Sequence, residues 1–180
     1  RVRRLDTDSA RRRGVLEEAL DGFRTGEVDV LLGTQMVAKG LDFPRVTLGG
    51  VVNADTQLLL PDFRSAERTF QLLTQVAGRA GRGTAPGQVI LQTAHPDHPA
   101  LVAAARQDYG LFYREEIRAR AEVGWPPHRR LVNLMLDGSD EPTVIAEAEK
   151  LATHLQREVR GGEGIEVLGP APQPVSRLNG

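Results

Sequence analysis

Glycine and arginine alternate at the end of a segment whose apolar pattern is helical. Residues 75–82 read QVAGRAGR, which places Arg79 and Arg82 each directly after a glycine. A glycine costs roughly 1 kcal/mol relative to alanine inside a helix, but it lets another backbone or a nucleotide approach closely. A guanidinium is a flat fork of donors suited to phosphate. The pattern indicates a phosphate-binding helix end, and a solvated basic helix that ends in a glycine-rich turn is the alternative.

A second candidate site is the loop GTQMVAKGLDF at residues 33–43. Gly33 and Thr34 directly follow an apolar strand pattern, so their amide groups and the threonine hydroxyl can face a phosphate. Lys39 can supply a charge to a phosphate, and Asp42, two residues after Gly40, can accept a hydrogen bond from a ribose hydroxyl. A strand-to-helix turn that needs a glycine and is capped by threonine is the simpler alternative.

The elements that must position these residues follow an α/β order. A helix over residues 9–26, with Asp8 or Ser9 as its N-cap, precedes a buried strand at 28–34. A second strand at 45–55, a second helix at 61–82 and a third strand at 87–93 follow. This alternation predicts a mostly parallel sheet covered by helices.

The second helix has two distinct faces at 100° of turn per residue. The apolar face is predicted to carry Ala66, Phe70, Leu73 and Ala77, and the opposite polar face Arg64, Arg68, Gln71, Gln75 and Arg79. We expect the polar face to lie over the carboxyl ends of the strands, where α/β folds bind their ligands.

A second domain is predicted after the sequence GWPP at 124–127, because two prolines cannot continue a helix. Helical stretches over 100–123 precede it, and a strand at 131–138, a helix at 144–159 and a strand at 165–170 follow. We therefore predict domains at 1–125 and 126–180. The second is expected to be an incomplete α/β domain and the chain an excerpt of a longer protein, since it lacks an initiator methionine and stops in a proline-rich stretch.

The composition is that of an ordinary globular protein, with 40% hydrophobic and 26% charged residues. The net charge is −1, and 21 of the 23 basic residues are arginine, which either phosphate recognition or a GC-rich genome explains. The absence of cysteine excludes disulfides and thiolate metal sites within the chain. Without a signal peptide or an apolar run of membrane-spanning length, a cytoplasmic location is expected.

Taken together, the two candidate sites resemble one family. GTQMVAKGLDFPRVTL followed by PDFRSAERTFQLLTQVAGRAGR is similar to motifs V and VI of superfamily 2 helicases, and most similar to those of the PriA family of bacterial replication-restart helicases. RLDTDSARRRG resembles the family's motif IV region, and VLGPAPQPVSRLNG the start of its C-terminal domain. The resemblance covers nearly the whole chain. It implies an α/β fold: a RecA-like, P-loop NTPase-type second helicase lobe, followed by part of a small α/β domain.

The resemblance also implies roles for the candidate residues. Arg82 corresponds to an arginine finger that reaches the triphosphate, Arg79 to a second phosphate or coupling contact, and Gln75 to a polar link with the nucleotide. Within the motif V loop, Gly33 and Thr34 are expected at the DNA backbone. Three others are expected nearer the nucleotide: Lys39, Gly40 and Asp42.

The function implied is an ATP-driven motor that binds forked and single-stranded DNA at stalled forks, unwinds it in the 3′→5′ direction and promotes primosome assembly. ATP and Mg²⁺ would be shared with a first lobe that this chain lacks, so the chain alone is not expected to hydrolyse ATP. Zn²⁺ is expected in the family's cysteine-rich region and not in this chain. The expected partners are single-stranded-DNA-binding protein and other primosome proteins, including the helicase-loading machinery; the protein is expected to be a monomer that binds no membrane.

Two alternatives to that function stay open. A non-catalytic scaffold of the same restart pathway would bind DNA and partners without turnover, and an unrelated translocase that shares motif VI is the more distant one. Asn53, where many relatives carry aspartate, is a departure that would weaken the motor if the carboxylate couples the lobes.

The remaining candidates have simpler structural interpretations. His95 and His98 have the residue type of metal ligands, but a loop that caps a helix is favoured, and no metal site is predicted. Trp125 either stacks a DNA base or, as we favour, anchors a domain junction. Arg177 belongs to the domain that, by resemblance, contacts DNA and protein partners. The basic start either tracks a phosphate backbone or is a solvated face; it comprises Arg1, Arg3, Arg4, Arg11, Arg12 and Arg13.

Overall fold

The computed structural model describes residues 1–5, 14–34, 45–78, 80, 86–159 and 164–172. By their internal contacts, these residues divide into two units, Arg1–Arg129 and Arg130–Gly180. The division lies four residues after the predicted boundary at 125/126. Within the described residues, no helix is both long and apolar enough to cross a membrane.

The first unit begins with a β–α–β segment. β1 (Val2–Leu5) and β2 (Val30–Gly33) are parallel, with Val2 opposite Val30 and Leu5 opposite Gly33, and α2 (Val15–Thr25) connects them. Leu20 of α2 packs with Leu5, which is only 1% exposed. β1 was not predicted from the sequence, because its arginines indicated only a charge run.

The N-cap predicted for the first helix is wrong. α2 begins at Val15, directly after Gly14, whose φ of 91° lies in the left-handed region that glycine adopts without strain. The proposed caps Asp8 and Ser9 lie outside the described residues. The helix ends at a second left-handed glycine, Gly26, with a φ of 87°.

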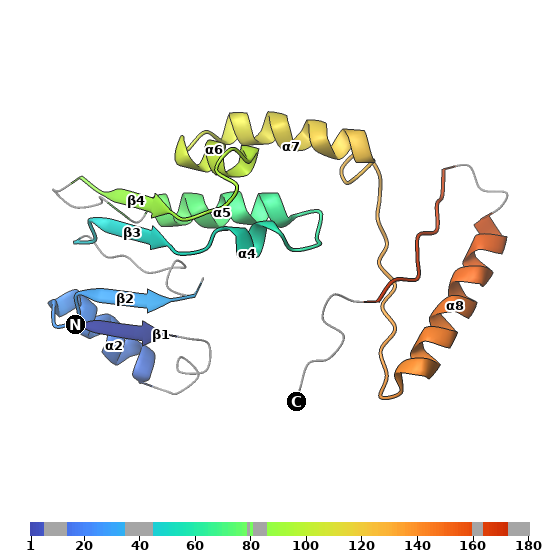
Figure 1. The fold of residues 1–180 in the computed structure, drawn as a ribbon, viewed down its shortest axis with the longest axis horizontal. Helices are drawn as coiled ribbons and strands as arrows, with labels where there is room; N and C mark the ends of the chain where they lie inside the picture. The colour runs from blue at the N-terminus through green and yellow to red at the C-terminus, as the bar shows by residue number, and fades with distance from the viewer. Residues whose placement is uncertain (6–13, 35–44, 79, 81–85, 160–163, 173–180) are drawn as a thin grey trace. The chain divides into compact units, whose positions relative to one another are not determined.

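A second β–α–β segment carries the motif VI helix. β3 (Leu48–Val51) and β4 (Gln88–Leu91) are parallel, and α4 (Asp55–Leu58) and α5 (Ser65–Ala77) lie between them in the sequence. In Figure 1, α5 lies along this strand pair. Two parallel pairs joined through helices confirm the predicted α/β class, although the strands are shorter than the predicted ranges.

The main core lies between α5 and the next two helices, α6 (Pro99–Ala105) and α7 (Tyr109–Val123). Phe70 and Leu73 of α5 are 5% and 2% exposed, which confirms the predicted apolar face. Phe70 stacks on Phe112 with ring centroids 4.3 Å apart. Alanines on α6 allow that helix to pack closely against α5, and α7 follows α6 on the same side of α5 (Figure 1).

The helical stretches predicted over 100–123 are confirmed as two helices, α6 and α7. The chain turns between α6 and α7 at Gln107, whose φ is 51°. The side chain of Asp108 then caps α7 by accepting a hydrogen bond from the Leu111 N–H at 2.8 Å. α7 ends at Gly124, with a φ of 70°.

The second unit contains α8 (Glu141–Glu158), capped by Asp140 as it accepts a hydrogen bond from the Thr143 N–H. This helix confirms the prediction for 144–159. The strands predicted at 131–138 and 165–170 are wrong, because the described residues of both ranges have no strand assignment. Alternating apolar residues favour an extended chain, but a strand also needs a hydrogen-bonded neighbour.

Candidate functional site

The predicted site residues fall into two groups. Five lie outside the described residues, and these are Lys39, Gly40, Asp42, Arg79 and Arg82. Gly33 and Thr34 are exposed at the carboxyl end of β2, and Gln75 is exposed in the last turn of α5. Gln75 therefore lies on the surface, three residues before the first Gly-Arg pair.

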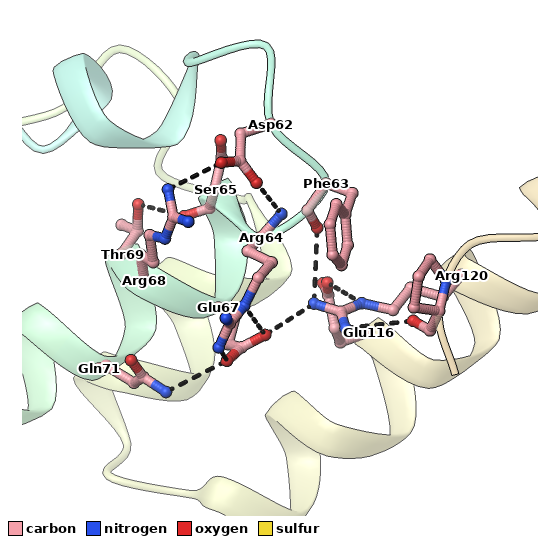
Figure 2. A network of polar contacts seen from close by, with 11 residues as sticks. Asp62, Phe63, Arg64, Ser65, Glu67, Arg68, Thr69, Gln71, Glu116 and Arg120 are labelled. Carbon is pink, nitrogen blue, oxygen red and sulfur yellow. Dashed lines mark hydrogen bonds and ion pairs between the residues drawn. The ribbon is translucent and has the colours of Figure 1, made fainter. Parts of the chain in front are cut away.

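The polar face of α5 is exposed as predicted, but its first two arginines are already paired. Arg64 donates to both oxygens of Glu67, at 2.6 and 3.2 Å. Arg68 forms an ion pair with Asp62 at 2.8 Å, as Figure 2 shows. These acids neutralise the amino-terminal half of the face, which leaves the carboxyl-terminal end of α5 as the better place for a phosphate.

The expected position of this face relative to the strands is wrong for the carboxyl-terminal end of α5. A Cβ added to Gly49, the second residue of β3, would lie 3.3 Å from a methyl carbon of Val76. The last turn of α5 therefore lies over the amino-terminal half of β3. The physical reason is topological: a helix that connects parallel strands runs back along them, so its end lies where the strands begin. Only Arg64 and its neighbours lie toward the carboxyl ends.

Arg120 of α7 is the centre of a polar network that sequence reasoning missed. Its side chain is 12% exposed, and its guanidinium forms ion pairs with Glu116 at 2.8 Å and Glu67 at 3.0 Å. It also donates to the carbonyl oxygens of Phe63 and Pro126, and lies 5.4 Å from the centroid of the Phe63 ring. In Figure 2 this guanidinium points at the carboxylate of Glu67, so it links α5 to α7 and to the turn that follows α7.

The charges in this network hold one another in the ionised state. Hydrogen bonds from Arg64, and then from Arg120, lower the pKa of Glu67 against the opposing effect of its partial burial. Burial opposes the charged form of Arg120, yet the hydrogen bonds to Glu116 and Glu67 raise its pKa. The spacing of Glu116 and Arg120, four residues apart on one helix, was the available sequence signal. Nothing in the sequence pointed to Glu67.

A second polar cluster joins the carboxyl ends of β3 and β4. The side-chain oxygen of Asn53 accepts hydrogen bonds from the N–H groups of Asp55 and Thr56 at 3.1 and 3.3 Å. Asp55 in turn accepts from the hydroxyl of Thr93 and from the N–H of Ala94, the latter at 2.8 Å. An aspartate at position 53 offers the same acceptor oxygen. The departure at Asn53 therefore leaves this turn intact.

We predict that Asp55 makes stability depend on pH. The hydrogen bond from Thr93, followed by that from Ala94, lowers the pKa of Asp55 below its ordinary value of 3.8. A folded-state pKa below the unfolded one means that the stabilisation is complete above the ordinary pKa and is lost as the pH falls through the folded value. Urea unfolding of the chain between pH 7 and pH 3 should show a smaller loss of stability for Asp55→Asn than for the parent. Equal losses for both would contradict the prediction.

The side chains of His98 and Trp125 have structural contacts. His98 caps α6, since its Nδ1 accepts a hydrogen bond from the Ala100 N–H at 3.2 Å, and burial lowers its pKa. This is the helix-capping interpretation that the sequence favoured. Trp125 packs edge-on against Phe63, with centroids 6.3 Å apart. In the described part of the chain, no cluster of histidines and carboxylates that could hold a metal ion is found.

The basic start of the chain forms β1 and its ion pairs. The guanidinium of Arg3 lies 3.5 Å from a carboxylate oxygen of Glu18. This contact favours the solvated-face interpretation over a phosphate track for Arg3. The other half of the run, Arg11 to Arg13, lies outside the described residues.

Comparisons with known proteins agree with the motifs. A family model described as the helicase conserved C-terminal domain matches residues 4–84, and one described as the primosomal protein N C-terminal domain matches residues 121–180. Replication restart protein PriA of Bacillus subtilis is 47% identical over 178 residues, which are 99% of this chain and 22% of that protein. The protein of the same name from Synechocystis is 44% identical over 97% of this chain and 21% of its own length. The chain thus spans about a fifth of these relatives.

Proposed function

Because this chain belongs to the PriA family of replication restart proteins, we propose that it supplies the second motor lobe of a DNA helicase. In this proposal, the full-length protein binds forked and single-stranded DNA, hydrolyses ATP and unwinds DNA in the 3′→5′ direction during primosome assembly. The observation that carries the proposal is the polar face of α5. Its early arginines are paired with acids, while Gln75 stands exposed before the two Gly-Arg pairs.

The proposed mechanism gives this lobe the charge-neutralising part of phosphoryl transfer. ATP bound with Mg²⁺ to a first lobe supplies the transferable phosphoryl group. Gln75 fits a role in nucleotide binding, since its exposed side-chain amide can form a hydrogen bond with a nucleotide. Arg82 would stabilise the charge that develops on the γ-phosphate, and Arg79 would make a second phosphate contact. Lys39, Gly40 and Asp42 are proposed to face the nucleotide as well.

DNA contact is proposed at the carboxyl end of β2. Gly33 and Thr34 are both exposed there, so a backbone amide and a hydroxyl are available to a phosphate of the strand. A loop that touches DNA at one end and nucleotide at the other would link hydrolysis to movement. We extend the proposal to binding of single-stranded-DNA-binding protein and helicase-loading proteins by the full-length monomer, with zinc held outside this chain.

The test is ATP hydrolysis by the full-length protein with and without a forked DNA substrate. We expect hydrolysis that rises when DNA is added. The isolated chain of 180 residues serves as the control and should be inactive, because it has no Gly-Lys-Thr phosphate-binding loop. If the full-length protein binds forks but shows no DNA-stimulated hydrolysis, the lobe is a scaffold and the motor proposal is wrong.

A further inference from the structure

Both tyrosines of the chain lie side by side on the surface of α7. Tyr109 and Tyr113 are four residues apart, which places them on the same face of the helix. They are 66% and 53% exposed, although aromatic side chains are usually among the more buried. Their rings are nearly parallel, at 26° to each other, with centroids 6.3 Å apart. The pair therefore presents two neighbouring aromatic faces to solvent.

The tyrosine pair is anchored at one end by the core. Tyr109 contacts Phe70 of α5, with centroids 6.2 Å apart, and Phe70 stacks in turn on Phe112. An aromatic side chain held in this way loses little further freedom when a ligand binds to it. The pair lies in residues 85–120, a stretch that neither matching family model covers.

Two exposed arginines flank the tyrosine pair in the sequence. They are Arg106 and Arg114, and neither forms an ion pair with another described residue. The guanidinium of Arg114 lies over Gly110, where an added Cβ would be 3.2 Å from one of its nitrogens and 3.3 Å from a carboxylate oxygen of Asp108. A Cβ at Gly110 would thus crowd the arginine that borders the rings.

The nearby carboxylates are already engaged. Asp108 caps α7 through the Leu111 N–H, Glu115 pairs with Arg118, and Glu116 pairs with Arg120. Two arginines with no ion pair to another described residue therefore flank the two exposed rings in the sequence. Exposed aromatic faces combined with arginine side chains are how proteins bind single-stranded nucleic acid without sequence preference.

We propose that Tyr109 and Tyr113 stack successive bases of single-stranded DNA, while Arg106 and Arg114 contact the adjoining phosphates. The inference rests on the proposed function, because it adds a contact to the DNA path of the same lobe. This contact would be additional to the DNA contact proposed for Gly33 and Thr34 at the carboxyl end of β2. It gives the second lobe a base-stacking contact in addition to backbone contacts.

The test uses the full-length protein and a fluorescein-labelled dT oligonucleotide, with binding measured by fluorescence anisotropy at several salt concentrations. Tyr113→Ala should weaken binding by about 5- to 150-fold, the range expected for loss of one stacked base. Tyr113→Phe, which keeps the ring, should bind within about twofold of the parent. The salt dependence should be unchanged in Tyr113→Ala, because stacking releases no counterions. In a double Arg106→Ala, Arg114→Ala variant, the slope should become shallower by roughly 1.4, or ~0.7 per lost phosphate contact.

A second measurement does not depend on any variant folding correctly. Photocrosslinking of the parent protein to an oligonucleotide that contains 5-iododeoxyuridine, followed by peptide mass spectrometry, should mark Tyr109 or Tyr113. If the parent binds the oligonucleotide, Tyr113→Ala binds it equally well and crosslinks map elsewhere, this inference is wrong and the proposed function stands. If the parent does not bind single-stranded DNA at all, the proposed DNA function fails, and this inference fails with it.

Discussion

Replacing Arg120 by alanine is expected to lower the free energy of unfolding of this chain by about 3 kcal/mol, near the lower end of the range for a broken buried ion pair. The substitution leaves Glu67 and Glu116, which are 20% and 18% exposed, without the guanidinium that both contact. It also removes the donor to the Phe63 and Pro126 carbonyl oxygens. The lower end of the range applies because both carboxylates keep some contact with water. Urea unfolding followed by far-ultraviolet circular dichroism measures the change.

Arg118 provides the matched control on the same helix. Its side chain is 68% exposed and pairs only with Glu115 among described residues, so Arg118→Ala should change stability by less than about 0.5 kcal/mol. Arg120→Lys keeps the charge but not the planar fork, and should fall between the parent and the alanine variant. Equal stabilities for Arg120→Ala and Arg118→Ala would mean that the network contributes nothing.

The parts of the fold that the sequence predicts are those governed by local periodicity. Buried Phe70 and Leu73 and exposed Gln75 follow from the 3.6-residue repeat of α5, because each residue's face depends only on its position within one helix. The order of α2, β2, β3, α5 and β4 followed in the same way from short apolar runs. β1 was not predicted because arginines occupy the middle of the strand and Leu5 is its only buried residue.

The parts that could not be predicted depend on contacts between distant residues. Glu67 and Arg120 are 53 residues apart in the sequence, and only the packing of α7 on α5 brings them together. The same holds for Asp55 and Thr93, which meet because their strands are neighbours. The apolar and polar faces of α5 were predicted correctly. The end of the strands that its carboxyl-terminal turn lies over was not, because the direction of a helix along a sheet depends on how the helix connects the strands.

Replacing Arg82 by alanine in the full-length protein should lower the rate of DNA-stimulated ATP hydrolysis by about 10³-fold, near the lower limit for loss of an arginine finger. The expectation rests on the motif VI resemblance, which assigns Arg82 to the γ-phosphate. Charge on the transferred phosphoryl group is then no longer neutralised from the second lobe, so the chemical step slows while DNA binding stays near that of the parent. A coupled hydrolysis assay and fork binding by anisotropy separate the two effects. Loss of both together would instead indicate misfolding or a role in DNA contact.

Arg68 allows the sharpest comparison, because it lies on the polar face of the same helix and is already paired with Asp62 at 2.8 Å. If the arginines near the start of α5 are neutralised and only the helix end serves the nucleotide, Arg68→Ala should hydrolyse ATP within about twofold of the parent, as expected for an exposed ion pair. Arg82→Lys should recover only part of the lost rate, since an ammonium supplies charge without the fork that fits phosphate. A parent-like rate in Arg82→Ala would mean that Arg82 is not the arginine finger. Arg79→Ala is then the variant to measure: a large loss of rate would assign the finger to Arg79, and a parent-like rate would mean that neither arginine of the two Gly-Arg pairs is the finger.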